Sequence, residues 1–339
     1  MEIKNEILNN QIKSILDAGL QNNTFEYLNH ADIDLIAQIA SNFKLNPDIN
    51  SDKEMLFVAA PTGAGKDTLV RKLTSHNPDK NYVVLNMDMF RHYYTDINKQ
   101  VEDISDKDFA LKTNEISYEI YYLIEELILN YYPGTNVILT GTMKDTPWVE
   151  SIFRKYKNYK YDISLSVLAV PYQESAFSIF ERYLNVVETQ LHSKTPDHSI
   201  IRYTDLTYHD ETFENFQKSL EHFENIMKAS PEELVNSISV YKRDKSVHDL
   251  SEDTLIFSTK SHSLENSATS VTKSVLNSKN EISVERFNTL LSLVAHNKDY
   301  LLEQGLFKEI GKSLNFVHSL DNKTFPEFQK TTEDIGFDY

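Results

Sequence analysis

The 339-residue sequence contains no cysteine, a single tryptophan and only eight glycines. The absence of cysteine excludes disulfide bonds, thiolate zinc sites and cysteine nucleophiles. Basic residues are also scarce: the sequence has 34 lysines and arginines against 51 acidic residues, which gives a formal net charge of −17. A chain with this excess of negative charge is repelled by nucleic acid, so we expect no nucleic-acid partner, although a local basic pocket for phosphates is compatible with it.

Long apolar runs are missing as well. The first residues, 1–8, carry charges throughout and lack the apolar core of a signal peptide, and no later run approaches the length of a membrane span. We therefore expect a cytoplasmic protein without a membrane partner, while export as an effector without a cleaved signal is compatible with the sequence. Tyrosine (19) and phenylalanine (18) are abundant, so the chain can fill one large α/β core with additions, or two domains.

Two of the few glycines lie in the most informative stretch of the chain. An apolar strand-like run at 54–60 leads into a turn with Gly63 and Gly65, and a helical pattern follows from Lys66. A strand, a glycine turn and a helix in this order are typical of a phosphate-binding P-loop, in which backbone N–H groups, the helix dipole and the lysine bind phosphates. A strand–helix turn without a ligand is the simpler alternative. The residues expected to contact ATP or GTP here are Thr62, Gly63, Ala64, Gly65, Lys66, Asp67 and Thr68.

The match to the P-loop pattern G-x-x-x-x-G-K-S/T departs at two positions. Ala60 stands where the first glycine belongs, and Asp67 stands where the magnesium-binding hydroxyl belongs, with Thr68 one place later. Magnesium accepts carboxylate and hydroxyl oxygens alike. We therefore expect Mg²⁺ to be bound by Asp67 or Thr68.

Strand-like and helix-like segments alternate after residue 50. Strands are expected at 54–60, 81–86, 136–140, 161–170 and 237–241, and helices at 105–130, 174–188 and 211–228. The pattern predicts an α/β fold, a P-loop NTPase or kinase-like parallel sheet with helices on both faces. The expected domains are an N-terminal helical segment (1–50), a P-loop kinase domain (51–250), a Ser/Thr-rich linker (251–280), read as a loop from residue 258 on, and a C-terminal helical region (281–339).

Ligands of open α/β sheets bind at the carboxyl ends of the strands, so the residues after each strand are the candidates for chemistry. Asp88, after the second strand, is the candidate general base for phosphoryl transfer to a hydroxyl. A water-mediated contact to Mg²⁺ and a purely structural cap are its alternative roles. Lys144 and Arg182 are candidates for stabilising charge on the transferring phosphoryl group, although a lone helical arginine is often solvated or paired.

Histidines occur in the polar stretch 192–198, where His192 and His198 suggest a metal site. Two histidines without a third ligand are weak evidence, because such polar loops are usually just exposed. We therefore expect no metal site from this stretch alone.

Together these segments resemble the zeta-toxin family, P-loop kinases related to UDP-N-acetylglucosamine kinase, over residues 54–250. The resemblance depends on the P-loop at 61–68, the acidic segment 84–91, the segment 136–144 and the Glu-Arg-Tyr at 181–183. The resemblance implies that Lys66 binds the phosphates, that Asp88 deprotonates a sugar 3′-hydroxyl, and that Arg182 contacts the transferring phosphate.

The sequence departs from the family pattern around the expected acceptor. Thr140 replaces a glutamate associated with sugar recognition, and Lys144 replaces an arginine, which loses the bidentate fork. Ser193 falls where a second phosphate-contacting arginine is expected, and Lys194 is its candidate substitute. The resemblance thus implies substrate contacts from Glu119, Thr140, Thr142, Lys144 and Lys194, and a nucleotide contact from Arg243.

The resemblance implies a toxin or effector that transfers the ATP γ-phosphate to a nucleotide sugar. The leading acceptor is the 3′-hydroxyl of UDP-N-acetylglucosamine. A housekeeping kinase for another nucleotide, dinucleotide or sugar is one alternative, and a non-catalytic nucleotide-binding interaction protein is a second. Family toxins are held inactive by a helical antitoxin, which makes an antitoxin the expected partner. Residues 1–50 are either a built-in inhibitor of this kind or helices that pack on the main domain.

Overall fold

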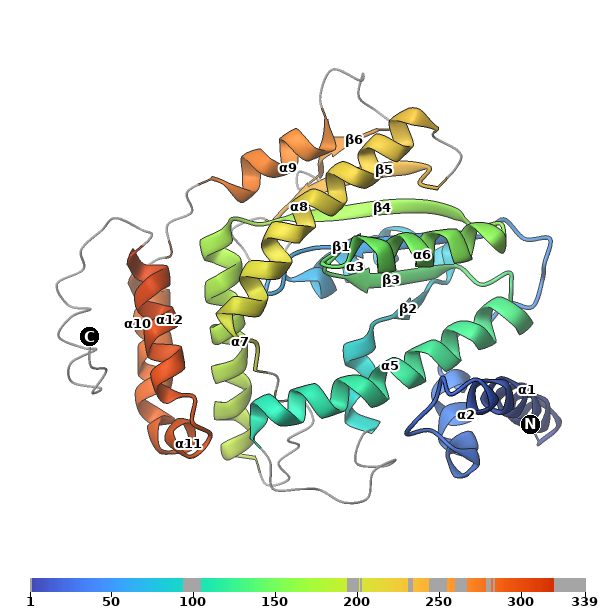
Figure 1. Cartoon of the computed structure of the whole chain (residues 1–339), viewed down its shortest axis with the longest axis horizontal. Coiled ribbons are helices and arrows are strands. Elements are labelled where there is room, and N and C mark those ends of the chain that lie inside the picture. Colours follow the sequence, from blue (N-terminus) through green and yellow to red (C-terminus); the bar gives the residue numbers. More distant parts are fainter. Residues whose placement is uncertain are drawn as a thin grey trace.

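The computed structural model describes residues 2–93, 105–193, 201, 203–230, 234–243, 255–259, 267–278, 282 and 284–319. A six-stranded sheet lies at their centre in the order β2-β3-β1-β4-β5-β6 (Figure 1). Neighbouring strands are parallel except for the antiparallel pair β5–β6, so the predicted α/β fold with a mostly parallel sheet is confirmed. The strands are β1 Glu54–Ala59, β2 Val83–Leu85, β3 Val137–Gly141, β4 Asp162–Ala169, β5 Ser237–Lys242 and β6 Leu255–Ser258.

Helices surround this sheet and extend beyond it. None of the described helices is long and apolar enough to cross a membrane. In chain order they are α1 Glu2–Gln21, α2 Ile33–Ser41, α3 Lys66–His76, α5 Asp106–Tyr131, α6 Thr146–Asn158, α7 Tyr172–Leu191, α8 Leu206–Ala229, α9 Ala268–Leu276, α10 Val284–His296, α11 Lys298–Glu303 and α12 Phe307–Ser319, with short 3₁₀ turns at His30–Asp32, Pro78–Lys80 and Met87–Tyr93.

The central strand β1 is apolar on both faces because helices cover both. Met55 and Phe57 belong to a buried cluster that includes side chains of α5, α6 and α8. Leu56 and Val58 point to the other face, where they share a cluster with Leu69 of α3. Successive side chains of a strand point to opposite faces, so one continuous apolar run fills two cores. The P-loop therefore follows the most buried strand of the sheet.

Three elements were not predicted from the sequence. The helix α6 has the apolar spacing of a packed helix. The strand β6 lies in the segment expected to be a linker, and α9 lies where a loop was expected from residue 258 on, so the loop expectation is wrong over α9. The local N-cap of α9 is Ser267, and a distant residue also holds the start of the helix: the Glu224 carboxylate of α8 accepts hydrogen bonds from the backbone N–H groups of Ala268 (2.8 Å) and Thr269 (2.9 Å). A Ser/Thr-rich sequence does not reveal a cap that comes from another helix.

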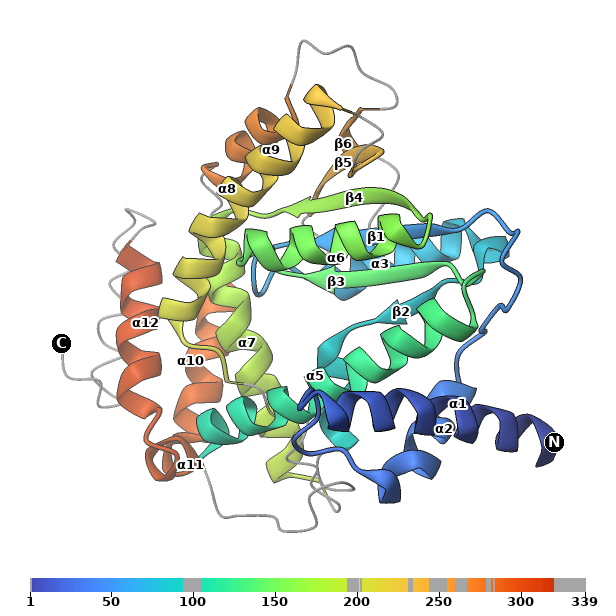
Figure 2. The ribbon, with the colours of Figure 1, turned by 45° about the vertical axis from the view of Figure 1, so that its right-hand side comes forward.

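The C-terminal helices α10 and α12 lie along α7 in both views (Figures 1 and 2). Phe287 and Leu291 of α10 share a buried cluster with Phe177 of α7. Arg286 adds ion pairs to Glu174 (2.7 Å) and Glu181 (2.6 Å) of the same helix. The C-terminal region is thus attached to the helix that carries Arg182.

The N-terminal helices α1 and α2 pack on α5, on the side away from α10 and α12 (Figure 2). The loop between them is fixed by the buried carboxylate of Glu119 in α5. This carboxylate accepts hydrogen bonds from the backbone N–H groups of Glu26 (2.6 Å), Tyr27 (3.1 Å) and Leu28 (2.8 Å). One side chain therefore anchors the N-terminal segment to the sheet domain.

We predict that Glu119→Ala destabilises the protein, because three N–H groups lose their acceptor at once. The free energy of unfolding should fall by roughly 2–4 kcal/mol, measured by denaturant titration. Hydrogen exchange at residues 24–30 should accelerate in the same variant. The control is Glu115→Ala, which removes only an exposed contact with the Tyr27 hydroxyl and should cost little. If Glu119→Ala had the same free energy of unfolding as the wild type, this anchoring role would be refuted.

Candidate active site

The turn after β1 has the geometry of a phosphate-binding loop. Gly63 (φ +81°) and Gly65 (φ +88°) both adopt the left-handed conformation that favours glycine, and α3 begins immediately afterwards at Lys66. The backbone N–H of Ala60 donates to the carbonyl of Gly141 (3.2 Å), which ties the start of the loop to the end of β3. The first N–H groups of α3 lie at the positive end of the helix, where phosphates bind.

A cavity of about 560 Å³ opens at the carboxyl ends of β1, β2 and β3. Its walls come from the P-loop, the segments after β2 and β3, the helices α5 and α7, and residues 203–208. The structure brings together in this lining the predicted residues Thr62, Gly63, Lys66, Asp88, Thr140, Thr142, Lys144 and Arg182.

Asp88 is held by a residue to which the sequence assigned no role. Arg91 donates from Nε to Asp88 Oδ1 (2.8 Å), and its other nitrogens donate to α5, at the Ala110 carbonyl (2.6 Å) and Asn114 Oδ1 (3.0 Å). The Asp88 N–H donates to Asn86 Oδ1 (3.1 Å). A carboxylate held in this way has a defined orientation toward the cavity that it lines.

The same asparagine reaches the expected magnesium ligand. Asn86 Nδ2 donates to Oδ1 of Asp67, which lies exposed in the first turn of α3 (3.4 Å). Thr68 instead accepts a hydrogen bond from the Arg71 guanidinium (3.3 Å), a cation that disfavours a metal ion at this hydroxyl. Carboxylate oxygen is a preferred ligand of Mg²⁺, so Asp67 fits the ion better than Thr68 does.

The two cationic candidates approach the cavity from different elements. Arg182 of α7 is exposed and donates to the hydroxyl of Thr204 (3.3 Å). Lys144, between β3 and α6, forms an ion pair with Glu211 (2.6 Å) and lies 4.4 Å from the ring centre of Tyr208. Both positive charges therefore border the space that an anionic ligand would occupy.

Six predicted residues do not line this cavity: Ala64, Gly65, Asp67 and Thr68 of the P-loop and its helix, and also Glu119 and Arg243. Glu119 binds the N-terminal backbone, as described above. Arg243 lies beside α7, where it contacts Glu174 (3.4 Å) and Ser178 (3.2 Å), and burial lowers the pKa of its guanidinium. Lys194 lies outside the described residues, so its proposed substrate contact stays a prediction.

The walls of the cavity also contain groups that the sequence did not single out. Tyr118, Trp148 and Tyr208 line it, and the two tyrosines are exposed on α5 and α8. Thr140, which the sequence did predict as a substrate contact, has a buried hydroxyl oxygen without a hydrogen-bond partner among the described residues. Aromatic faces bind rings, and an unpaired buried hydroxyl requires a partner, so both features suit a polar ring-containing ligand.

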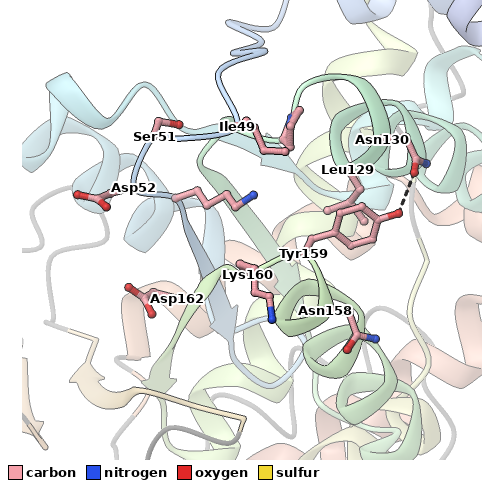
Figure 3. A pocket seen from close by; sticks show the side chains of 11 residues that line it. Ile49, Ser51, Asp52, Leu129, Asn130, Asn158, Tyr159, Lys160 and Asp162 are labelled. Carbon is pink, nitrogen blue, oxygen red and sulfur yellow. Dashed lines mark hydrogen bonds between the residues drawn. The ribbon is translucent and has the colours of Figure 1, made fainter.

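A second cavity, of about 500 Å³, lies at the opposite, amino-terminal edge of β1 and β4 (Figure 3). Asp52, Lys53, Lys160 and Asp162 mix opposite charges in its walls, and the Tyr159 hydroxyl donates to Asn130 (2.8 Å). Ligands of parallel α/β sheets bind at the carboxyl ends. The first cavity is therefore the candidate active site.

The fold and the glycine loop define a P-loop α/β protein. The zeta toxin family model matches residues 37–254, more than half of the sequence, and the chain belongs to the zeta toxin family. No curated protein matches it significantly.

Solved structures share the fold at low sequence identity. A structure from the PezAT chromosomal toxin–antitoxin system of Streptococcus pneumoniae aligns with a TM-score of 0.55 at 16% identity, covering 82% of this chain and 98% of that one. The AvrRxo1-ORF1:AvrRxo1-ORF2 complex aligns with a TM-score of 0.50 at 12% identity, covering 84% of this chain and 86% of its own.

We predict unequal costs for alanine at the two P-loop glycines. A Cβ at residue 63 would lie 2.2 Å from the Ser175 carbonyl oxygen of α7, whereas nothing lies within 4 Å of one at residue 65. Gly65→Ala should therefore cost roughly 1–2 kcal/mol of unfolding free energy from its positive φ alone, and Gly63→Ala clearly more. Thermal unfolding measures both.

The matched control is Gly305→Ala, which has the same kind of positive φ (+70°) and open space but lies outside the P-loop. It should resemble Gly65→Ala in stability. Equal stability of Gly63→Ala and Gly65→Ala would contradict the tight contact of the P-loop with α7.

Proposed function

We propose that this protein is a kinase that transfers the γ-phosphate of ATP (or GTP) to a hydroxyl of a nucleotide sugar, first of all the 3′-hydroxyl of UDP-N-acetylglucosamine. The observation that carries the proposal is that Lys66, Asp88 and Arg182 come from three separate elements and line one cavity beside the P-loop. Membership of the zeta toxin family supports this reading of the site.

Each of these side chains has a role that suits its position. Asp88 accepts the proton of the acceptor hydroxyl while that oxygen attacks the γ-phosphorus, the bond from phosphorus to the bridging oxygen breaks and ADP leaves. Arg91 keeps the Asp88 carboxylate oriented. Lys66 binds the outer phosphates, and Arg182 offsets charge on the transferring group. Mg²⁺, when held by Asp67, would supply further neutralisation of the phosphates.

The cavity also supports a nucleotide-sugar acceptor. A volume of about 560 Å³ lies within the usual range for small-molecule sites. The rings of Tyr118, Trp148 and Tyr208 offer faces for a base or sugar, and the unpaired Thr140 hydroxyl offers a polar contact. Because Thr140 stands where the family pattern has a sugar-recognising glutamate, a different nucleotide, dinucleotide or sugar is the alternative acceptor.

We further propose that a partner protein regulates the site. The similar structures come from a toxin–antitoxin system and from a two-protein complex, which supports a partner of antitoxin type here. The alternative inhibitor is the chain's own N-terminal segment. Its described residues, 2–50, pack against α5 and contribute nothing to the lining of the cavity, which favours an external partner.

We predict that the purified chain, incubated with Mg²⁺, ATP and a panel of nucleotide sugars, adds one phosphate to a member of the panel. The mass of each acceptor is followed by mass spectrometry. Asp88→Asn should keep ATP binding, because it is isosteric, but should slow transfer by roughly 10²–10⁴-fold without its general base. Lys66→Ala should weaken ATP binding itself.

Asp79→Asn is the matched control, since Asp79 is an exposed carboxylate outside the cavity, and it should transfer at the wild-type rate. ATP binding without transfer to any nucleotide sugar, nucleotide or sugar offered would favour the non-catalytic alternative. Absence of ATP binding would refute the P-loop assignment.

We predict that deletion of residues 1–50 lowers stability and does not raise activity. The deletion would expose the apolar face of α5 and leave the buried Glu119 carboxylate without its three N–H donors. Thermal unfolding and phosphate transfer, measured on the same sample, separate the two effects. A folded truncation with higher activity would instead establish the built-in inhibitor.

A further inference from the structure

A cluster of two histidines and one carboxylate lies where the C-terminal helices meet α7. Glu188 belongs to α7, His192 is the residue that caps the end of α7, and His296 ends α10. One ligand atom from each residue lies within 4.8 Å of the others. His192 Nε2 and His296 Nδ1 are each 3.1 Å from the same oxygen, Glu188 Oε1. We propose that this cluster binds a divalent cation of the zinc type, which clips α10 to α7.

The spacing of the donor atoms suits such an ion. Residues 188 and 192 are four apart on one helix and so lie on the same face. A tetrahedral zinc ion with bonds of 2.0–2.1 Å separates its ligand atoms by roughly 3.3 Å, close to the 3.1 Å between each imidazole nitrogen and the Glu188 oxygen. The two imidazole nitrogens lie within 4.8 Å of each other. The His192 and His296 side chains are 63% and 61% exposed, so an ion can reach them from solvent.

The surroundings of the cluster favour positive charge. His192 is the C-terminal cap of α7, and His296 is the last residue of α10, so two helix ends with partial negative charge meet at this point. The short helix α11 begins at Lys298 and places one helix N-terminus beside them. Asn297 donates from Nδ2 to Glu188 Oε2 (2.8 Å) and to the Leu293 carbonyl (2.8 Å). Asn297 is buried, so it fixes the carboxylate with Oε1 toward the histidines, as an outer-shell ligand does in metal sites.

The donor set also determines which ion is expected. Two imidazole nitrogens and one carboxylate oxygen are typical zinc ligands and leave one position for water, whereas Mg²⁺ prefers oxygen ligands throughout. The chain has no cysteine that could compete for zinc. Arg182 precedes His192 by ten residues, roughly 15 Å along the helix, so this site is separate from the candidate active site. The inference does not depend on the proposed kinase activity.

The fold brings to His192 the further metal ligands that the sequence around it lacked. The stretch 192–198 offered two histidines and no third ligand, and His198 lies outside the described residues. The second histidine instead comes from α10, more than a hundred residues later, and the carboxylate from one turn earlier in α7. A bound ion would join the C-terminal helices to the helix that carries Arg182 and touches the P-loop.

The test is titration of the full-length, chelator-treated protein with Zn²⁺ by calorimetry, in parallel with Co²⁺ absorption. We expect one high-affinity equivalent, and we expect His192→Ala and His296→Ala each to weaken it at least 100-fold. Zn²⁺ should raise the melting temperature of the wild type and not of these two variants. Millimolar Mg²⁺ should not displace the ion.

His76→Ala is the matched control, because His76 is an exposed histidine at the end of α3, and it should bind Zn²⁺ like the wild type. Asn297→Ala should weaken binding about tenfold while the Co²⁺ spectrum keeps its shape, as expected for a positioning residue. Because both histidines are exposed, their variants should fold, which circular dichroism checks. Absence of Zn²⁺ binding to the wild type, or unchanged affinity in both histidine variants, would overturn the proposal.

Discussion

The close contact between the P-loop and α7 constrains most of the molecule. The backbone carbonyl of Ser175 occupies the place where a side chain at residue 63 would lie, so the loop and the helix can be joined only through glycine. The Ser175 hydroxyl also lies 2.9 Å from Nε2 of His209, a fully buried residue of α8 whose pKa is lowered by burial. The two helices are therefore set by the phosphate-binding turn, and with them Arg182 and the C-terminal helices that pack on α7. The positions of Arg182 and of the C-terminal helices therefore depend on this one close contact between the backbones of Gly63 and Ser175.

Buried carboxylates attach the accessory elements to this centre. Glu119 holds the N-terminal loop, Glu224 caps α9, Glu174 binds Arg286 of α10, and Asp106 accepts hydrogen bonds from the hydroxyls of Tyr183 (2.7 Å) and Tyr300 (2.8 Å). A buried carboxylate is costly unless several donors reach it, and these carboxylates meet that condition. For Glu224, burial opposes ionisation, but hydrogen bonds from Thr269, Lys228 and Ala268 prevail and lower its pKa. Some of the acidic residues of the chain therefore serve to hold the accessory elements in place.

The sequence predicted those features that local pattern determines. The P-loop, the long helix α5 and the placement of Asp88 and Lys144 after strands and of Thr140 near a strand end all follow from short-range periodicity and from the rule for strand ends. These three residues meet in one cavity, as that rule requires. Contacts between distant segments were not predictable in this way. The attachment of Arg91 to α5, the backbone contacts of Glu119 and the contact of Glu224 with the start of α9 each depend on a partner that only the fold places nearby. A histidine pair separated by more than a hundred residues carries no local signal at all.

The altered P-loop is consistent with this arrangement when its charges are considered together. Asp67 adds a negative charge beside the P-loop, and a phosphate bound there would be repelled unless a cation lay between the two negative groups. Lys66 is one such cation, and a magnesium ion on the Asp67 carboxylate would be the second. Asn86 links the two sides of the site, because its amide nitrogen contacts Asp67 while its oxygen accepts the Asp88 N–H. The carboxylate that replaces the usual hydroxyl is thereby connected through one side chain to the segment that carries the candidate base.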